Sequence, residues 1–462
     1  MIFLPTLSLK KQTPLYMKWG CYIVIILCVL FMAGCGRNDA AFKKGSGAPA
    51  ETASEDEYFQ APTETVAETA GVSADEPGSG ETVSEEGPVQ ATEPEKEEPS
   101  ETPEQEEEEP AQALRIIMVG DILLHTPVEK AAKNDETGEY DFDFIFDHSR
   151  DIISEADIAI ANQEVIIGGE ELGVSGYPAF NAPYEVSDAL YNAGFDVICH
   201  GTNHALDRGS KGIVNCLDNW RKTYPDMLVL GIYDNEQDAS AERVPIIERN
   251  GIRVAVLNYT YGTNGIPAPA DMPYAVSMLD KERVVAQLDI AEKEADFTIV
   301  CPHWGTEYNL GISSYQKKWT EIFREHGADA VIGTHPHVIE PVVFYEDEDA
   351  DNITNNHGGG DMPVFYSLGN FVNWTSGTGK GVANRMVGGM ADISISRKEN
   401  GEVSIDDHSV HSFVCHVRSG DRNVTVYPLE EYSEELASQN EIRKQDSSFS
   451  REYCDELISR VY

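Results

Sequence analysis

The feature that most constrains the fold is an alternation of short apolar runs with longer amphipathic stretches, which begins at Leu114. The short runs predict buried strands at 114–119, 157–161, 195–199, 227–230, 253–257, 297–301, 330–332, 364–366, 403–405 and 410–417. Apolar residues with helical spacing at 213–220 and 315–323 predict helices between them. Gly194 and Gly327 stand where helices should end, directly before the next strand. The pattern alone therefore predicts an α/β protein with one doubly wound sheet and helices on both faces.

The N-terminus carries a different kind of signal. Lys10, Lys11 and Lys18 precede an apolar run at 21–33 that is short and basic-flanked compared with an ordinary membrane span. The run ends in Met-Ala-Gly-Cys35, which resembles the lipobox of bacterial lipoproteins. The resemblance implies a signal peptide at 1–34, a lipid on Cys35 and an extracytoplasmic protein anchored to the cell membrane. A plain signal peptide and an uncleaved anchor are the alternatives.

Composition divides the rest of the chain. Residues 35–110 are rich in Glu, Pro, Thr and Ser, and they contain too few large apolar side chains to offset the entropy of ordering. We expect a disordered, self-repelling stalk there, followed by a globular domain at 111–427 and a tail at 428–462 with a terminal helix and a loose end. The formal net charge of −46 repels phosphate backbones and excludes nucleic acid as a partner.

Cysteine usage does not indicate a thiolate metal site. Beyond Cys35, the chain has an odd number of cysteines without CxxC spacing, namely Cys199, Cys216, Cys301, Cys415 and Cys454. We expect buried apolar side chains, with room for one disulfide.

Polar motifs follow the predicted strands at the same end in each unit. These motifs contain Asp121, Glu164, Asn203-His204, His303, His335-Pro-His337 and Asn370. In an open α/β sheet, the loops at the carboxyl ends of the strands converge, and ligands bind there. A single histidine in such a place is more often structural, but six motifs at one edge favour a site.

The residue types indicate a metal. Imidazole nitrogens together with carboxylate and amide oxygens suit Mn, Zn or Fe. The candidate ligands are Asp121, Glu164, Asn203, His204, His303, His335 and His337. Seven ligands exceed the needs of one tetrahedral ion, whereas two ions that share a carboxylate would use them all.

The same stretches resemble the CapA family of poly-γ-glutamate capsule synthesis proteins, which is related to calcineurin-like metallophosphoesterases. The matching stretches, in family order over about 114–395, are 118–124, 162–164, 180–209, 303–308, 333–338 and 367–371. The resemblance implies a metallophosphoesterase-like layered β-sandwich flanked by helices, in place of one doubly wound sheet. It places the seven candidates in a metal site and gives His204 a catalytic role beside the leaving group.

Two positions depart from the phosphoesterase pattern. Leu123 stands where the Asp-x-His motif has histidine, with His125 as the nearest substitute, and Thr202 replaces a second Asn. The first departure leaves open whether the site holds one ion or two. Glu307 is a candidate general base or partner of an imidazole, with a loop salt bridge as the alternative. Asp207 is expected to cap the following helix or to support His204.

Three functions fit these observations. The first is a CapA-like lipoprotein that acts in capsule synthesis, export or anchoring, with an anionic polymer and other capsule-synthesis membrane proteins as partners. The second is a metal-dependent phosphoesterase or other hydrolase at the cell surface. The third is a non-catalytic polymer-binding or spacer lipoprotein, which the metal-type residues disfavour. The sequence does not decide whether the protein is an enzyme.

Overall fold

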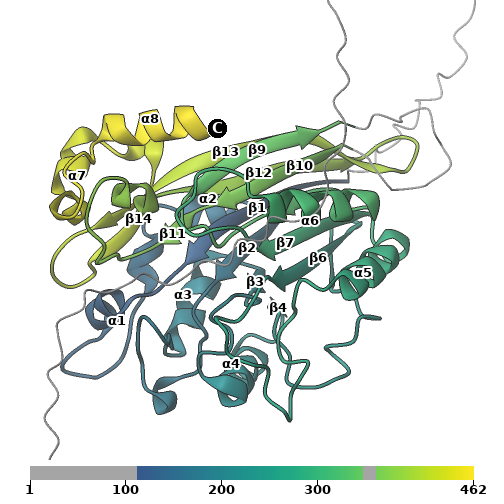
Figure 1. Ribbon diagram of the computed structural model, residues 1–462, viewed down its shortest axis with the longest axis horizontal. Helices are drawn as coiled ribbons and strands as arrows, with labels where there is room; N and C mark the ends of the chain where they lie inside the picture. Colours follow the sequence, from purple (N-terminus) through teal and green to yellow (C-terminus); the bar gives the residue numbers. More distant parts are fainter. Residues whose placement is uncertain (1–111, 347–360) are drawn as a thin grey trace, which may run out of the picture. The chain divides into compact units, whose positions relative to one another are not determined.

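The computed structural model describes residues 112–346 and 361–462, which form two mixed β-sheets with helices on their outer faces (Figure 1). The predicted signal peptide, the lipid site Cys35 and the acidic stalk lie outside the described residues. No helix in the described part of the chain is both long and apolar enough to span a bilayer.

The first sheet has the strand order β14-β13-β12-β1-β2-β3-β4, with β11 paired to β1. Strands β1 to β4 are parallel neighbours, and β12 to β14 extend the sheet by antiparallel pairing. The strands are β1 (Ala113–Ile122), β2 (Ile158–Gln163), β3 (Val197–Cys199), β4 (Leu228–Leu230), β11 (Asn370–Val372), β12 (Val387–Arg397), β13 (Val403–Val417) and β14 (Val424–Pro428).

The second sheet has the order β5-β6-β7-β8-β10-β9. Strands β6, β7, β8 and β10 are parallel, and the edge strands β5 and β9 are antiparallel to their neighbours. The strands are β5 (Ile246–Arg249), β6 (Ile252–Thr260), β7 (Phe297–His303), β8 (Ala330–Ile332), β9 (Ile339–Tyr345) and β10 (Met362–Leu368).

Alternate side chains of each strand point into different cores. On β1, Ile116 and Met118 face the second sheet, while Ile117 and Val119 face the helices on the other side. One apolar core therefore lies between the sheets, and one lies on the outer face of each sheet. Burial on both faces explains why these strands read as continuous apolar runs in the sequence.

Helices cover both outer faces (Figure 1). The α-helices are α1 (Thr126–Ala132), α2 (Arg150–Ser154), α3 (Glu185–Ala193), α4 (Gly209–Thr223), α5 (Lys281–Glu294), α6 (Ser314–Glu325), α7 (Glu434–Gln439) and α8 (Arg451–Val461). The 3-10 helices are η1 (Asp143–Phe146), η2 (Glu170–Leu172), η3 (Val382–Met386), η4 (Leu429–Glu431) and η5 (Glu441–Lys444). Helices α3 and α4 pack on the first sheet, and α5 and α6 on the second. Local signals fix several ends: α6 begins with a capping box between Ser313 and Gln316, and α3 ends at left-handed Gly194.

The layered two-sheet sandwich expected from the family resemblance is confirmed, and the single doubly wound sheet expected from the pattern alone is wrong. Each predicted strand overlaps an observed one, but the pattern does not reveal that β5 to β10 form a separate sheet. Partner choice depends on contacts between distant segments, which periodicity does not encode.

The C-terminal segment and the cysteines both contribute to the apolar cores. The segment from 429 to 462 packs onto the helix-covered face of the first sheet through buried Tyr432, Phe449 and Leu457. The five cysteines beyond Cys35 are free and buried, as expected of apolar packing residues, and none forms a disulfide in the described part of the chain.

Candidate metal centre

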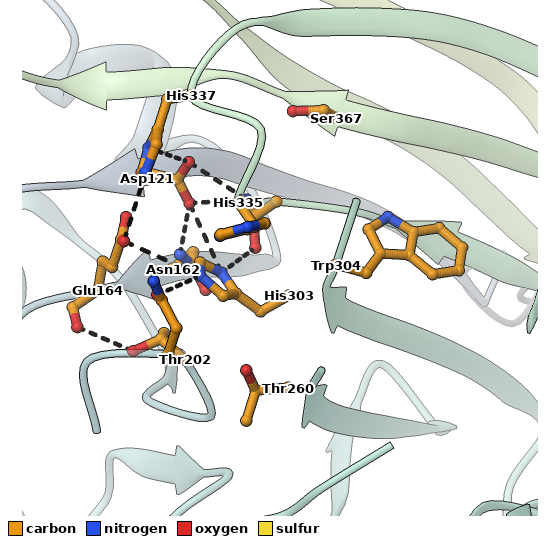
Figure 2. A network of polar contacts seen from close by, with 12 residues as sticks. Asp121, Asn162, Glu164, Thr202, Thr260, His303, Trp304, His335, His337 and Ser367 are labelled. Carbon is orange, nitrogen blue, oxygen red and sulfur yellow. Dashed lines mark hydrogen bonds and ion pairs between the residues drawn. The ribbon is translucent and has the colours of Figure 1, made fainter. Parts of the chain in front are cut away.

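The carboxyl ends of strands from both sheets meet at one place. Asp121 lies near the end of β1, Glu164 directly follows β2, and His303 is the last residue of β7 (Figure 2). Close backbone approach makes this junction compact: a Cβ atom on Gly120 would lie 2.0 Å from the carbonyl oxygen of Gly369. Glycine at 120 therefore lets β1 lie against the turn between β10 and β11.

Two carboxylates and one histidine form the tightest group. One ligand atom each from Asp121, Glu164 and His337 lie within 4.8 Å of one another, and all three residues are buried. His337 Nδ1 is 3.3 Å from Asp121 Oδ2, and its Nε2 is 3.7 Å from Glu164 Oε1. Oxygen and imidazole donors at this spacing match the ligand set of a divalent transition metal.

Glu164 and Asp121 are held very differently. Asp121 Oδ1 accepts a hydrogen bond from Asn162 Nδ2 at 2.8 Å, and the backbone N–H of His335 points to both of its oxygens at 3.3 Å. Neither side-chain oxygen of Glu164 has a hydrogen-bond partner among the described residues, although its side chain is fully buried. Burial raises the pKa of Glu164 well above its usual range, opposed by the charge of His337. A buried carboxylate without donors is stabilised by a nearby positive charge, which protonated His337 or a cation in its place can supply.

His303 joins this group through its own hydrogen bonds. Its Nε2 lies 2.9 Å from Asn203 Oδ1, and its Nδ1 lies 3.0 Å from Thr334 Oγ1. The ring also approaches Asp121 at 3.8 Å and Glu164 at 3.9 Å. Burial and the neighbouring histidines lower the pKa of His303 well below its usual range. It is therefore a neutral imidazole, the form that binds metals.

His335 and His337 lie on a strained loop after β8. Their φ angles are +100° and +59°, in a region that residues other than glycine rarely adopt. Each such residue costs on the order of 1–3 kcal/mol in backbone strain. The His335 ring lies 4.8 Å from that of His303, and its buried Nδ1 has no hydrogen-bond partner in the described part of the chain. Burial lowers the pKa of His335 well below its usual range. The loop thus directs the His337 imidazole toward the carboxylates and the His335 ring toward His303, at a cost in backbone energy.

The protonation of His337 reflects its surroundings. Burial lowers its pKa, but the carboxylates of Glu164 and Asp121 outweigh this effect, so that its pKa rises to about 9. His337 would have to lose this proton to bind a cation through the nitrogen that carries it.

His204 stands beside the group with its own acidic partner. Its Nδ1 is 2.7 Å from Asp207 Oδ2, and its Nε2 is 4.0 Å from Glu164 Oε1. The Phe180 ring packs against it in a T-shaped arrangement, with the ring centroids 4.7 Å apart. Of the two roles expected of Asp207, the contact with His204 is the one observed, since α4 begins without a side-chain cap. Asp207 fixes the imidazole so that Nε2 faces the centre.

The structure gathers all seven predicted ligands, whereas Glu307 lies at the rim, where its charge acts on Glu164 and His337. Glu307 is exposed in the loop after β7, and it forms no ion pair with any residue that the structure describes. Leu123 belongs to the apolar core, so it provides no ligand where the phosphoesterase pattern has histidine. Thr202 donates a hydrogen bond to the backbone carbonyl of Glu164 at 2.9 Å and thereby fixes the turn that carries the carboxylate.

Two asparagines in the centre belong to the strand-end motifs but were not among the predicted site residues. Asn162 holds Asp121, and Asn370 Oδ1 lies 3.0 Å from His337 Nδ1. Both residues belong to the strand-end motifs, so their position was a usable signal. Amide side chains are common in turns, however, and their contacts depend on pairing of β1 with β2 and β11.

Comparisons with known proteins agree with this organisation. Residues 115–375 match the family model described as Bacterial capsule synthesis protein PGA_cap. The chain is 28% identical over 265 residues to the PGA biosynthesis protein CapA of Bacillus subtilis (strain 168), covering 56% of this chain and 63% of that protein. It is 27% identical over 278 residues to the capsule biosynthesis protein CapA of Bacillus anthracis, covering 57% and 61%. The match thus spans less than two thirds of these relatives.

Solved structures with similar architecture include two nucleotidases. The NAD nucleotidase of Haemophilus influenzae aligns with a TM-score of 0.39 and 12% identity, over 76% of this chain and 60% of the other. A 5'-nucleotidase precursor from Thermus thermophilus aligns with a TM-score of 0.36 and 13% identity, over 65% and 54%. The family match, which covers more than half of the chain, shows that this protein belongs to the PGA_cap family of bacterial capsule synthesis proteins.

Proposed function

We propose that this protein acts in the synthesis, export or anchoring of an anionic capsule polymer, the PGA for which its relatives are named, through a divalent cation held at the strand-end centre. Family membership supports the capsule role. The observation that carries the cation is Glu164, whose two buried oxygens have no donor among the described residues while three histidines and Asp121 surround it. One or two ions of Mn, Zn or Fe suit these donors.

The residues of the centre have two roles: some would bind the ion, and others orient those side chains through hydrogen bonds. Asp121, Glu164, His303 and His337 would bind a cation directly, and His335 and Asn203 offer donors for a second position. The cation would supply Lewis acidity toward an oxygen of the ligand. Asn162, Asn370 and Thr334 orient the side chains that bind it. Such outer partners commonly contribute about 10–100-fold to metal affinity.

Metal analysis of the purified chain tests the proposal. We expect at least one tightly held divalent ion per chain in the wild type, and loss of that ion in Glu164→Gln, which keeps the shape but removes the charge. Glu340→Gln is the matched control, because Glu340 is equally buried but accepts a hydrogen bond from Gln316. A metal-free wild type after growth with ample Mn and Zn would contradict the proposal, as would equal metal content in all three proteins.

Hydrolysis is the second candidate function, and the His204–Asp207 contact favours it. An imidazole with its Nδ1 fixed by a carboxylate can give a proton from Nε2 to a leaving oxygen, and Nε2 faces the centre here. The substrate would be a phosphoester or a linkage within the capsule polymer. Metal binding without turnover of either substrate class would favour the non-catalytic, polymer-binding role.

Attachment to the membrane is a separate proposal that rests on the lipobox-like sequence before Cys35. A lipid on Cys35 would place the acidic stalk and the domain outside the membrane, beside other capsule-synthesis membrane proteins. Cys35→Ser should release the protein from the membrane fraction and abolish labelling by a fatty-acid analogue. Unchanged fractionation of the variant would contradict lipid anchoring.

A further inference from the structure

We infer that Arg385, stacked on Tyr308 at the rim of the metal centre, binds an oxyanion of the ligand, either a carboxylate or a phosphate group. The inference rests on the proposed function, because it concerns the ligand that the centre receives. It adds a residue that determines specificity for anionic ligands.

Three contacts place Arg385 beside the centre. Its Cζ atom lies 3.6 Å from the centroid of the Tyr308 ring, and that ring lies 5.8 Å from the His337 ring. Its backbone carbonyl accepts a hydrogen bond from Asn370 Nδ2 at 3.0 Å, and Asn370 Oδ1 contacts His337. The Tyr308 ring alone thus lies between the guanidinium and His337, a candidate metal ligand. Asn370 alone connects the backbone of Arg385 to the same histidine.

The guanidinium retains most of its hydrogen-bonding capacity. Its Nη1 donates a hydrogen bond to Thr375 Oγ1 at 3.0 Å. Among the residues that the structure describes, Arg385 has no carboxylate partner, whereas Arg115, Arg221 and Arg253 each pair with an aspartate. Arginine presents its donors in a planar fork that fits carboxylate and phosphate oxygens. A half-buried arginine held in place without an acid is suited to receive an anion from solution.

Electrostatics explains why an anion needs this residue. The centre carries the carboxylates of Asp121 and Glu164, and exposed Glu307 adds negative charge at the rim. A divalent cation offsets the first two charges, but it leaves little attraction for a ligand that is itself anionic. Arg385 supplies that attraction where the ligand would enter.

Tyr308 gives the arginine a fixed platform. Its backbone N–H donates to the carbonyl of Pro336 at 2.8 Å, and Pro336 lies between His335 and His337. Its φ angle of +64° is strained, so the local fold maintains this ring position at a cost. The loop that carries His335 and His337 therefore also positions the ring on which Arg385 stacks.

Calorimetric titration of the full metal-loaded chain tests the inference, with inorganic phosphate and a γ-linked glutamate oligomer as separate probes. We expect Arg385→Gln to weaken binding of at least one probe by about ten- to a hundredfold, as for loss of a charge-assisted hydrogen bond, with bound metal unchanged. The affinity of Arg385→Lys should lie between those of the wild type and Arg385→Gln, because lysine keeps the positive charge but lacks the planar set of donors. Arg324→Gln is the matched control: Arg324 also stacks on a tyrosine, 5.7 Å from the Tyr345 ring, on the outer face of the second sheet.

Each outcome has one meaning. Weakened binding of phosphate alone, or of the glutamate oligomer alone, supports the inference and identifies the oxyanion. Binding of both probes by Arg385→Gln as by the wild type overturns it, and so does a wild type that binds neither. Loss of the metal from Arg385→Gln also overturns it, since the residue would then support the centre instead of the ligand. A metal-free wild type that binds a probe through Arg385 contradicts the proposed function but leaves the assignment of Arg385 intact.

Discussion

Two buried glutamates lie at strand ends in different sheets, and only one of them has the surroundings of a cation site. Glu164 follows β2 in the first sheet, and Glu340 lies on β9 in the second, with 1% and 0% of their surfaces exposed. Burial raises the pKa of both, well above the usual range for Glu164 and to about 8 for Glu340, where the Gln316 hydrogen bond opposes it. Burial and a raised pKa therefore do not by themselves distinguish a metal ligand.

The neighbours make the difference. Glu340 Oε2 accepts a hydrogen bond from Gln316 Nε2 at 2.5 Å, and Gln316 is itself fixed by the capping box of α6. Around Glu164 the described residues place no donor of that kind, but His204, His303 and His337 lie within 4.0 Å of Oε1. One environment suits a protonated, structural carboxyl group. The other suits a carboxylate that shares a cation with imidazoles.

The largest expected effect concerns stability on metal removal. Chelation should destabilise the wild type, by about 2.7 kcal/mol where the free ion had been at 100 times its Kd, because the ion binds the folded state. Glu164→Gln should lose little on chelation, and Glu340→Gln should lose as much as the wild type. The measurement is the free energy of unfolding in denaturant, with and without chelator. Equal sensitivity of the two variants would erase the contrast between these glutamates.

The next effect separates holding the metal from moving a proton. Asp207→Asn leaves the ligands of the centre in place but removes the carboxylate that fixes His204. If the protein is a hydrolase, we expect turnover of a generic phosphodiester to fall by about 10²-fold, the lower range for general acid catalysis, with metal content unchanged. The measurement pairs the steady-state rate with metal analysis. A parallel loss of metal would instead make Asp207 a support of the centre.

A third prediction uses pH to isolate Glu340. Since its folded-state pKa of about 8 exceeds the ordinary value of 4.5, the folded protein holds a proton that the unfolded chain has released between these values. The contribution of this group to stability is therefore full below about pH 4.5 and declines as pH rises toward 8, by at most about 1.4 kcal/mol per pH unit. Glu340→Gln should remove this decline, so that its stability relative to the wild type increases from pH 5 to 8. Parallel stability curves for the two proteins would show that Glu340 does not titrate in this range.

How far the sequence leads depends on the range of the interactions involved. The runs around Leu114 and Phe297 predict strands because burial on both faces leaves a local signature. The polar residues after them predict a site because parallel strands bring their ends to one edge. The division into two sheets was not predictable from periodicity, because it depends on which strands pair at long range.

The same reasoning applies inside the centre. Histidines and carboxylates were identifiable by type, and the structure brings them together. The roles of Asn162 and Asn370 were not identifiable, because an amide acquires its role from one particular contact. The role of Arg385 was even less identifiable from the sequence. This residue lies outside the strand-end motifs, and it reaches the rim of the centre by stacking on Tyr308.

The smallest expected effect concerns Thr202, the departure from the Asn of the phosphoesterase pattern. Its hydroxyl donates to the backbone carbonyl of Glu164 and not to a metal ligand atom, and the backbone N–H of His204 points back to it at 3.3 Å. Thr202→Val should therefore cost about 1 kcal/mol in the free energy of unfolding, the net value of one hydrogen bond, and metal content should stay the same. Thr202→Ser is the control, because it keeps the hydroxyl. Loss of metal in Thr202→Val but not in Thr202→Ser would show that the turn after β2 positions Glu164 through this single bond, and that the departure from Asn changes the centre itself.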